Sequence, residues 1–223
     1  MAQKTKNTRV DDAYDRLKSE ILQSKLPPGF QAPEPDIAER LGMSRTPVRE
    51  ALIRLEADGL VDLVPRRGAR VLGTSVQDLI EIYELLGALE PLAVAALAQQ
   101  TIPGDELDKL EAIIRNLEAS VFAGDVEAWA IADDDFHRKL LSLNGNRRLE
   151  RIAGVLHDQI YRGRMVLLRM RSHPIAEAQE YRDLVAAIVS GSDSNAFEQL
   201  RKHREKALDA LKEIFITCRL PQI

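Results

Sequence analysis

The sequence predicts a mainly α-helical protein with two domains: a small N-terminal domain of three helices and a β-hairpin, and then an antiparallel bundle of about six helices. Three observations predict this fold. Two short helical segments flank a turn at Gly42. Two apolar runs surround a basic turn at residues 66–68, as in a hairpin. After residue 73 only helical periodicity is found, interrupted by glycine, proline and asparagine.

Charge is distributed unevenly along the 223 residues. Residues 1–75 contain 13 Lys and Arg against 11 Asp and Glu, whereas residues 76–223 contain 18 against 24. Although the net charge of the chain is −4, residues 1–75 carry a small excess of positive charge. This is expected if only the N-terminal part binds nucleic acid phosphates.

Cysteine content and apolar runs indicate the cellular compartment. The single cysteine, Cys218, excludes an internal disulfide framework and is typical of the reducing cytoplasm, where we expect the protein. The polar N-terminal residues lack the apolar segment of a signal peptide. The most apolar run, residues 85–98, is broken by Glu90 and is too short to cross a bilayer, so we expect no membrane partner.

The first two helices are predicted from apolar spacing and from the residues that end them. The first should cover about residues 11–23 and stop before the turn at residues 27–29; its predicted buried face is Val10, Tyr14, Leu17 and Ile21. The second should cover residues 36–41 and end at Gly42.

The third helix carries the first candidate binding residues. Ser44 is a suitable N-cap, and Pro47 lies in the first turn, where its missing N–H is tolerated. Offsets of three and four place one set of residues on a buried stripe: Val48, Ala51, Leu52 and Leu55. Arg45, Thr46 and Arg49 then lie on the opposite, exposed side. A helix, a glycine turn and a second helix form the geometry that seats the second helix in the DNA major groove.

The hairpin is predicted within residues 60–71, with Arg66, Arg67 and Gly68 at its tip. Two arginines beside a flexible glycine suit contacts with phosphates or with a minor groove. An exposed basic turn without a ligand is the alternative. Because the helix pair directly precedes it, we interpret the hairpin as the wing of a winged helix-turn-helix domain.

Several stretches of this domain closely resemble the winged helix-turn-helix of GntR-family bacterial transcription regulators. They are residues 26–29 (LPPG), 37–52 (IAERLGMSRTPVREAL), 55–60 (LEADGL) and 67–68 (RG). The resemblance implies that DNA is contacted by Ser44, Arg45, Thr46, Arg49, Arg66, Arg67 and Gly68. It also implies a homodimer on a palindromic double-stranded operator. Pro35 departs from the family, whose members often have a DNA-contacting Arg at that place.

Six further helices are predicted, at residues 76–101, 105–122, 126–143, 147–171, 174–189 and 194–218. Pro91 lies inside the first of them and should kink it, leaving the Gly87 carbonyl unpaired. The expected domains begin with a flexible N-terminus (residues 1–10) and a winged helix-turn-helix domain (11–73). A linker (74–78) joins these to a helical effector-binding and dimerisation domain (79–219), which is followed by a tail (220–223).

The third of these helices carries a carboxylate and an imidazole on an apolar face. Asp133 and His137 share a stripe with Trp129, Phe136 and Leu140, and the acidic and basic residues between them, such as Asp134, should point elsewhere. Burying two such groups without partners would be costly.

Two later polar residues also interrupt apolar stripes. They are Tyr181 and His203, and we expect them to converge with Asp133 and His137 inside the bundle.

Three interpretations of this set remain open. The side chains could hydrogen-bond one another; Asp133, His137 and His203 could hold a divalent zinc, nickel or manganese ion; or the set could bind a small organic ligand directly. If the cluster activated water, the protein would be a metal-dependent hydrolytic enzyme, which is the alternative function.

The long fourth bundle helix adds three further candidate pocket residues: His157, Arg162 and Arg164. The alternative is that these three are partly exposed side chains with no role in a pocket, which is the more common situation for histidine and arginine.

The bundle resembles the FCD effector domain of the FadR-like branch of the same family. The resemblance rests on Asp133 and His137, on the Asn-Gly-Asn turn at residues 144–146 and on the late His203. Many members bind a metal through Asp and three histidines, and the metal helps to hold a carboxylate effector. Here Tyr181 replaces one histidine, and Leu86 replaces an Arg that can meet the carboxylate.

The two resemblances together imply a ligand-responsive DNA-binding regulator rather than an enzyme, most commonly a repressor released by its ligand. With the two arginines of the fourth bundle helix added, the predicted effector-binding residues are Asp133, His137, Tyr181, His203, Arg162 and Arg164.

Overall fold

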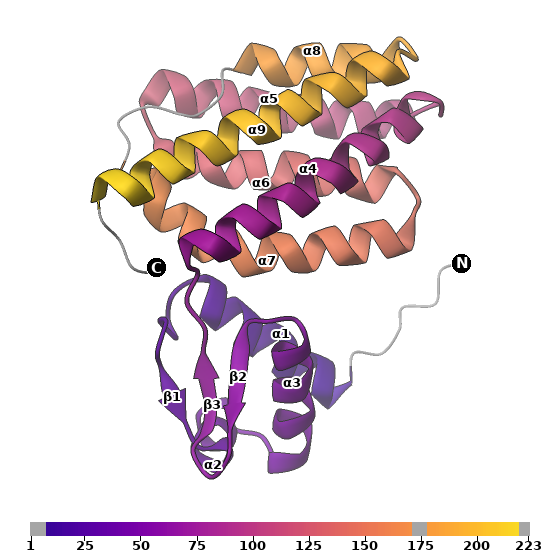
Figure 1. The fold of residues 1–223 in the computed structure, drawn as a ribbon. Coiled ribbons are helices and arrows are strands. Elements are labelled where there is room, and N and C mark those ends of the chain that lie inside the picture. The colour runs from indigo at the N-terminus through magenta and orange to yellow at the C-terminus, as the bar shows by residue number, and fades with distance from the viewer. Residues whose placement is uncertain (1–7, 171–177, 219–223) are drawn as a thin grey trace. The chain divides into compact units, whose positions relative to one another are not determined.

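The structure is a computed structural model that describes residues 8–170 and 178–218. The chain forms two compact units that divide between Thr74 and Ser75. The first is a small helical unit with a three-stranded sheet, and the second is built from helices (Figure 1). The predicted fold class, a winged helix-turn-helix followed by a helical bundle, is confirmed.

The first unit contains α1 (Arg9–Leu22), α2 (Glu34–Leu41) and α3 (Arg45–Ala57). Its sheet has the strand order β1-β3-β2 and is antiparallel, with bounds β1 (Gln31–Ala32), β2 (Val61–Val64) and β3 (Gly68–Val71). In the β2–β3 hairpin Val61 pairs with Val71, and Val64 pairs with Gly68. The two-residue strand β1 was not predicted, because it is too short to show an alternating pattern.

The helix bounds follow from local capping. A capping box between Thr8 and Asp11 begins α1 at Arg9. Because Pro35 fits the first turn of a helix, α2 begins at Glu34 and not at residue 36. Ser44 has the extended backbone of an N-cap, but its side chain makes no capping hydrogen bond. Gly42 ends α2 with a φ of 65°, a conformation that glycine adopts without strain.

The buried face of α1 differs from the prediction. Leu17 and Ile21 are buried as expected, but Ala13 is the third buried residue, and Val10 and Tyr14 are only half-buried. Tyr14 is amphipathic, and its hydroxyl donates a 2.6 Å hydrogen bond to Asp58 at the end of α3. Tyr14 therefore lies at the edge of the core, where its polar tip has a partner.

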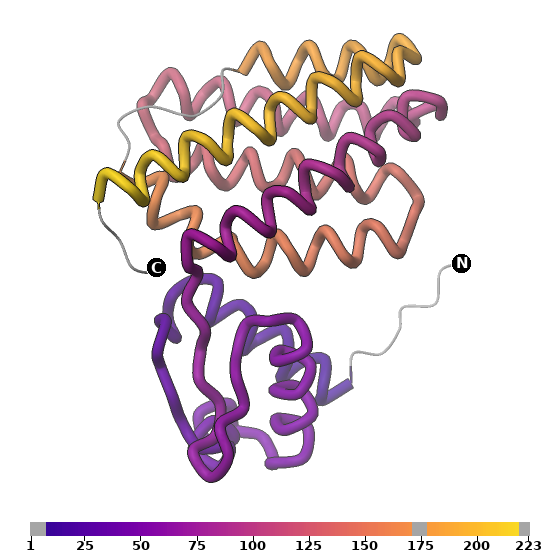
Figure 2. Tube along the Cα trace, viewed as in Figure 1, coloured from indigo at the N-terminus to yellow at the C-terminus, as the bar shows by residue number. Residues whose placement is uncertain are grey.

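The second unit contains α4 (Val76–Ala98), α5 (Gly104–Ala123), α6 (Val126–Leu143), α7 (Arg147–Arg169), α8 (Ala178–Val189) and α9 (Asp193–Cys218). The long helices α4 and α9 pack along each other, and α6 lies between α5 and α7 (Figure 2). Side chains from all six helices form the interior, and those of α4, α6, α7, α8 and α9 position the candidate site.

The helix ends agree with the predicted ranges to within a few residues wherever they are described. Helix α4 continues through Pro91 and ends at Ala98. The predicted break at residues 173–174, the predicted start of a helix at residue 174 and the tail at residues 220–223 lie outside the described residues, as do residues 1–7. Among the helices that the structure describes, none has the length and apolar character needed to span a membrane.

Candidate functional site

The exposed face of α3 carries four of the predicted DNA-contacting residues: Ser44, Arg45, Thr46 and Arg49. All four side chains are exposed, while Pro47, Val48, Ala51, Leu52 and Leu55 are buried. Burial of the apolar stripe fixes the rotation of α3, so the two arginines, four residues apart, project together from its first turns.

The tip of the β2–β3 hairpin exposes Arg66 and Arg67. Arg66 has a φ of 65°, and the Arg67 amide donates a 3.0 Å hydrogen bond to the Val64 carbonyl, which closes the turn. A cavity of about 410 Å³ between α2, α3 and the hairpin is lined by Arg49 and Arg66. The hairpin therefore brings a second arginine to the same side of the unit as α3.

Gly68 is half-buried and lies against β1. A Cβ atom there would lie 2.1 Å from the Ala32 carbonyl oxygen, closer than any two such atoms can approach. Glycine is required at this position by close packing between strands.

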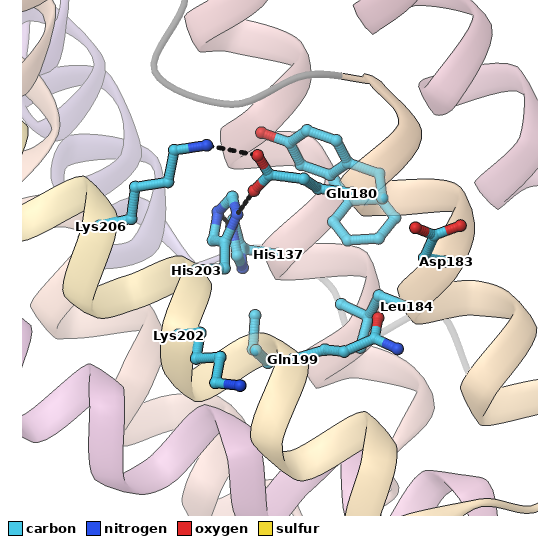
Figure 3. A pocket seen from close by; sticks show the side chains of 11 residues that line it. His137, Glu180, Asp183, Leu184, Gln199, Lys202, His203 and Lys206 are labelled. Carbon is cyan, nitrogen blue, oxygen red and sulfur yellow. Dashed lines mark hydrogen bonds and ion pairs between the residues drawn. The ribbon is translucent and has the colours of Figure 1, made fainter.

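The buried cluster in the second unit centres on Asp133 and His137 of α6 and His203 of α9. Nε2 of His137 lies 3.3 Å from Oδ1 of Asp133 and 3.3 Å from Nε2 of His203. Nε2 of His203 lies 3.8 Å from the same Asp133 oxygen. Three potential ligand atoms thus face a common point, as Figure 3 shows for the two histidines.

Each histidine of this cluster has a carboxylate near its Nδ1 atom. Nδ1 of His137 is 3.4 Å from Glu90 of α4, and Nδ1 of His203 is 3.5 Å from Glu180 of α8. Glu180 also pairs with Lys206 (Figure 3). A carboxylate at Nδ1 of His203 favours the tautomer that carries its proton there and leaves the Nε2 lone pair directed at the common point, whereas Nδ1 of His137 makes no hydrogen bond within the described residues.

Asp133 has two further partners. The Tyr181 hydroxyl donates a 2.6 Å hydrogen bond to Oδ1, and the Arg164 guanidinium of α7 donates to Oδ2. Burial alone would raise the pKa of the Asp133 carboxyl, but the charges of Arg164, His137 and His203 hold it well below its usual range. Asp133 is therefore a carboxylate with both oxygens engaged.

Tyr181 stays protonated in this environment. Burial and the negative charge of Asp133 raise the pKa of its phenol well above the usual value. Tyr181 thus acts as a hydrogen-bond donor to Asp133.

The two histidines have different electrostatic surroundings. Burial lowers the pKa of His203. Burial and Arg204 also disfavour a charge on His137, but the carboxylates of Glu90 and Asp133 outweigh them and raise its pKa.

A second buried network adjoins the cluster. Glu90 accepts two hydrogen bonds from Arg204, one of them 2.6 Å long, and another of 2.7 Å from His157. His157 also contacts Asp134, which pairs with Arg138. This arrangement corrects two predictions: Asp134 was expected to point away from the interior but is buried, and His157 was expected to be partly exposed.

One feature of the sequence points to this network, because Glu90 is a charge within an apolar helical run. That charge argues against a membrane span but does not by itself identify a buried ion pair. Arg204 directly follows His203 and was not predicted as an interior residue.

Arg162 and Arg164 are also buried and not partly exposed as predicted. They are two positions apart on α7, so their side chains leave the helix in different directions. Arg164 reaches Asp133, whereas burial lowers the pKa of Arg162. Of the six predicted effector-binding residues, the structure brings five together around Asp133: His137, Tyr181, His203, Arg164 and Asp133 itself.

A cavity of about 420 Å³ opens beside the cluster, between α6, α8 and α9 (Figure 3). His137, Tyr181 and His203 line it together with Phe136, while Glu180, Lys202 and Lys206 add charged groups. The cavity has the size of a small-molecule site and mixes apolar and charged lining, as ligand pockets do.

The cluster fits a divalent metal ion. Zinc bound tetrahedrally by nitrogen and oxygen at 2.0 to 2.1 Å separates its ligand atoms by about 3.3 to 3.4 Å. Two separations in the cluster are 3.3 Å and the third is 3.8 Å. His203 also has the outer carboxylate partner that metal-bound histidines usually show, Glu180, and Glu90 lies 3.4 Å from Nδ1 of His137. Asp133, His137 and His203 could therefore hold an ion by three protein ligands.

Comparison with known proteins matches both units to family models. Residues 9–71 match the model described as bacterial regulatory proteins, gntR family, and residues 81–206 match the FCD domain. An HTH-type transcriptional regulator of Agrobacterium vitis is 41% identical over 140 residues, which are 60% of this chain and 80% of that protein.

Two further comparisons cover most of the chain. A protein of Paenarthrobacter nicotinovorans, named a probable D-xylose utilization operon transcriptional repressor, is 30% identical over 202 residues, or 89% of this chain and 87% of that one. The solved structure of E. coli McbR/YncC superposes with a TM-score of 0.77 at 24% identity, covering 92% of this chain and 98% of the other. The latter similarity concerns the fold.

Proposed function

The chain belongs to the GntR family of bacterial transcription regulators and carries an FCD domain, and we propose that it represses transcription from a palindromic operator until it binds a small carboxylate. Its relatives are transcription regulators, some named as repressors, and such regulators are not enzymes. The proposal that the protein responds to a ligand rests on the convergence of Asp133, His137 and His203 beside a cavity of ligand size.

DNA is bound by the first unit in this proposal. The first turns of α3 enter the major groove, where Arg45 and Arg49 read base edges and phosphates together with Ser44 and Thr46. The hairpin tip at Arg66, Arg67 and Gly68 reaches the adjacent minor groove. Exposure of these arginines supports the assignment.

Two such units act together in a homodimer, because a palindromic operator presents two equivalent half-sites. The second unit, taken as residues 79–219, carries the dimer contacts. Leu85 and Leu92 support this proposal: they lie seven residues apart on one face of α4 and are 51% and 57% exposed.

Asp133, His137 and His203 would hold one divalent ion, zinc, nickel or manganese. The bound ion would supply positive charge that attracts a carboxylate. Glu180 fixes the tautomer of His203, Glu90 places negative charge beside His137, and Tyr181 orients Asp133. A ligand beside the ion would meet Arg164 within the interior and Arg162 on a neighbouring part of α7.

Ligand binding would act on DNA affinity through a conformational equilibrium. The dimer alternates between spacings of its two DNA-binding units that match the half-sites and spacings that do not, with residues 74–78 as the linker. A ligand that binds the mismatched state more tightly shifts the population toward it and releases the operator.

The test begins with selection of genomic DNA fragments by the purified full-length protein, followed by measurement of operator affinity by fluorescence anisotropy. A panel of small carboxylates is then titrated with and without added Zn²⁺. We expect one class of carboxylate to weaken operator binding by about tenfold or more. Unchanged DNA affinity and unchanged thermal stability across the panel would exclude carboxylate sensing.

Metal content is tested separately by native mass spectrometry of protein purified without added metal or chelator. We expect one bound ion in the wild type and none in His203→Ala. An ion that persists in His203→Ala would contradict the proposed ligand set.

A further inference from the structure

Arg164 already pairs with the Asp133 carboxylate, which the proposed metal ion would need as a ligand. Arg164 is only 4% exposed, and its guanidinium donates to Oδ2 of Asp133. Tyr181 donates to Oδ1 of the same carboxylate. Asp133 is therefore already neutralised and fully hydrogen-bonded by the protein's own side chains.

The interior around Asp133 is balanced in charge. Glu90 and Asp133 each pair with one buried guanidinium, Arg204 and Arg164 respectively, and the neighbouring buried Asp134 pairs with Arg138. A divalent ion added to this set would bring two positive charges without counter-charges into a region of low dielectric constant. Because an uncompensated buried charge is costly, the ion needs an anion to accompany it.

Tyr83 provides a hydrogen-bond donor near Arg164 and Arg204 that has no acceptor within the described residues. It is buried on α4, and within the described part of the chain its hydroxyl has no hydrogen-bond partner. The Arg204 guanidinium lies 5.8 Å from the centroid of its ring, and the charges of Arg164 and Arg204 both oppose the rise in its pKa that burial causes. Leu86, one turn later on α4, offers no polar atom.

From these contacts we propose that Arg164 is a resident counter-cation that the metal ion displaces. With no ion bound, Arg164 neutralises Asp133; when the ion binds Asp133, the guanidinium turns to the incoming carboxylate, to which Tyr83 also donates. Metal and carboxylate consequently bind as a pair, each increasing affinity for the other. This inference rests on the proposed metal site and assigns its anion-binding residues.

The first test uses the wild-type full-length protein and needs no variant. Zn²⁺ affinity is measured by competition with a chromophoric chelator, with and without excess acetate, which binds free Zn²⁺ only weakly. We expect acetate to tighten Zn²⁺ binding by about tenfold or more. Equal Zn²⁺ affinity with and without acetate would overturn the proposal.

The second test replaces the counter-cation. Arg164→Met keeps the apolar stem and removes the charge, so we expect Zn²⁺ to bind about tenfold or more tightly without acetate, and the effect of acetate to disappear. If Arg164 instead served to orient Asp133 as a ligand, the same variant would lose about 10 to 100-fold in Zn²⁺ affinity. The two readings therefore predict changes of opposite sign.

Matched variants isolate the effect. Arg169→Met removes an exposed arginine of α7 that pairs with Glu127, and it should leave both Zn²⁺ affinity and the acetate effect unchanged. Tyr83→Phe should reduce the acetate effect and leave Zn²⁺ affinity without acetate intact. A full acetate effect in Tyr83→Phe would remove Tyr83 from the anion site.

His203→Ala separates this inference from the proposed metal site. If neither the wild type nor Arg164→Met binds Zn²⁺ more tightly than His203→Ala does, the metal site itself is wrong. If the wild type binds Zn²⁺ through His203 but acetate and Arg164→Met change nothing, the metal site stands and the counter-cation role is refuted.

Discussion

The Tyr181 hydroxyl donates a 2.6 Å hydrogen bond to Oδ1 of Asp133, the oxygen that lies 3.3 Å from Nε2 of His137. Its ring also packs against His203, with ring centroids 5.4 Å apart. Tyr181 thus stands beside all three members of the cluster but keeps its proton, because burial and Asp133 raise its pKa. A residue that coordinates through a neutral nitrogen would offer a fourth ligand there.

Tyr181→His is therefore expected to strengthen metal binding. An imidazole at this position would add a ligand that needs no deprotonation, and Zn²⁺ affinity should rise about tenfold or more. Tyr181→Phe is the control, because it removes the hydroxyl and adds no ligand. Chelator competition measures both; equal Zn²⁺ affinities in the two variants would show that residue 181 does not face the ion.

Glu90 and Arg204 form the most buried ion pair that joins α4 to α9. Glu90→Gln leaves the Arg204 guanidinium buried without a full counter-charge, so we expect a loss of about 3 to 5 kcal/mol in the free energy of unfolding. Glu127→Gln breaks an exposed pair with Arg169 and should cost at most about 1 kcal/mol. Urea unfolding compares the two, and similar losses would contradict a structural role for the buried pair.

Much of the site was predictable from periodicity within single helices. Asp133 and His137 are four residues apart on an apolar stripe, and Tyr181 and His203 each interrupt another, so their burial followed from the sequence. The same reasoning failed for Asp134, which is buried although it leaves α6 on another side.

This failure has a physical cause. Helix α6 contacts α5 on one side and α7 on another, so more than one of its faces is covered, and His157 of α7 provides Asp134 with a partner. Partners on other helices cannot be read from the periodicity of one helix. Arg204 was missed as an interior residue for the same reason, and Arg164, although predicted as a pocket candidate, was expected to be partly exposed. Long cationic side chains become buried only where a carboxylate pairs with them.

The exposed arginines of α3 give a prediction for DNA binding. If each reads a guanine, Arg45→Ala and Arg49→Ala should each weaken operator binding by about 1 to 3 kcal/mol. Lys25→Ala, an exposed cation in the loop after α1, is the control for a general loss of charge. Fluorescence anisotropy on the selected operator measures all three; unchanged affinity in both arginine variants would refute this placement of the helix.

Asp11 gives a prediction of pH dependence. Hydrogen bonds from Thr8 and Arg54 lower the pKa of the Asp11 carboxyl from 3.8 to about 2. Since the folded-state pKa is the lower one, this carboxylate stabilises the fold at pH values above about 4, and its contribution disappears as the pH falls toward 2.

Amide hydrogen exchange in the first turn of α1 should therefore accelerate over that pH range, after correction for the intrinsic exchange rate. Asp11→Asn should flatten the dependence, whereas Asp12→Asn, at an exposed neighbouring position, should keep it. The same profile in wild type and Asp11→Asn would show that the capping box does not control this turn.

Gly68 tests whether strand packing holds the wing. Its φ is +83°, and a Cβ would lie 2.1 Å from the Ala32 carbonyl oxygen, so Gly68→Ala should break the pairing of β1 with β3. We expect a loss of about 2 kcal/mol or more in stability, and weaker operator binding because the arginines at the tip lose their support.

Gly29→Ala is the matched control: its φ is +79°, but no atom lies within 4 Å of its Cβ. It should incur only the backbone strain of about 1 to 2 kcal/mol and keep operator affinity. Equal stability losses and equal DNA affinities in the two variants would mean that the hairpin does not depend on its contact with β1.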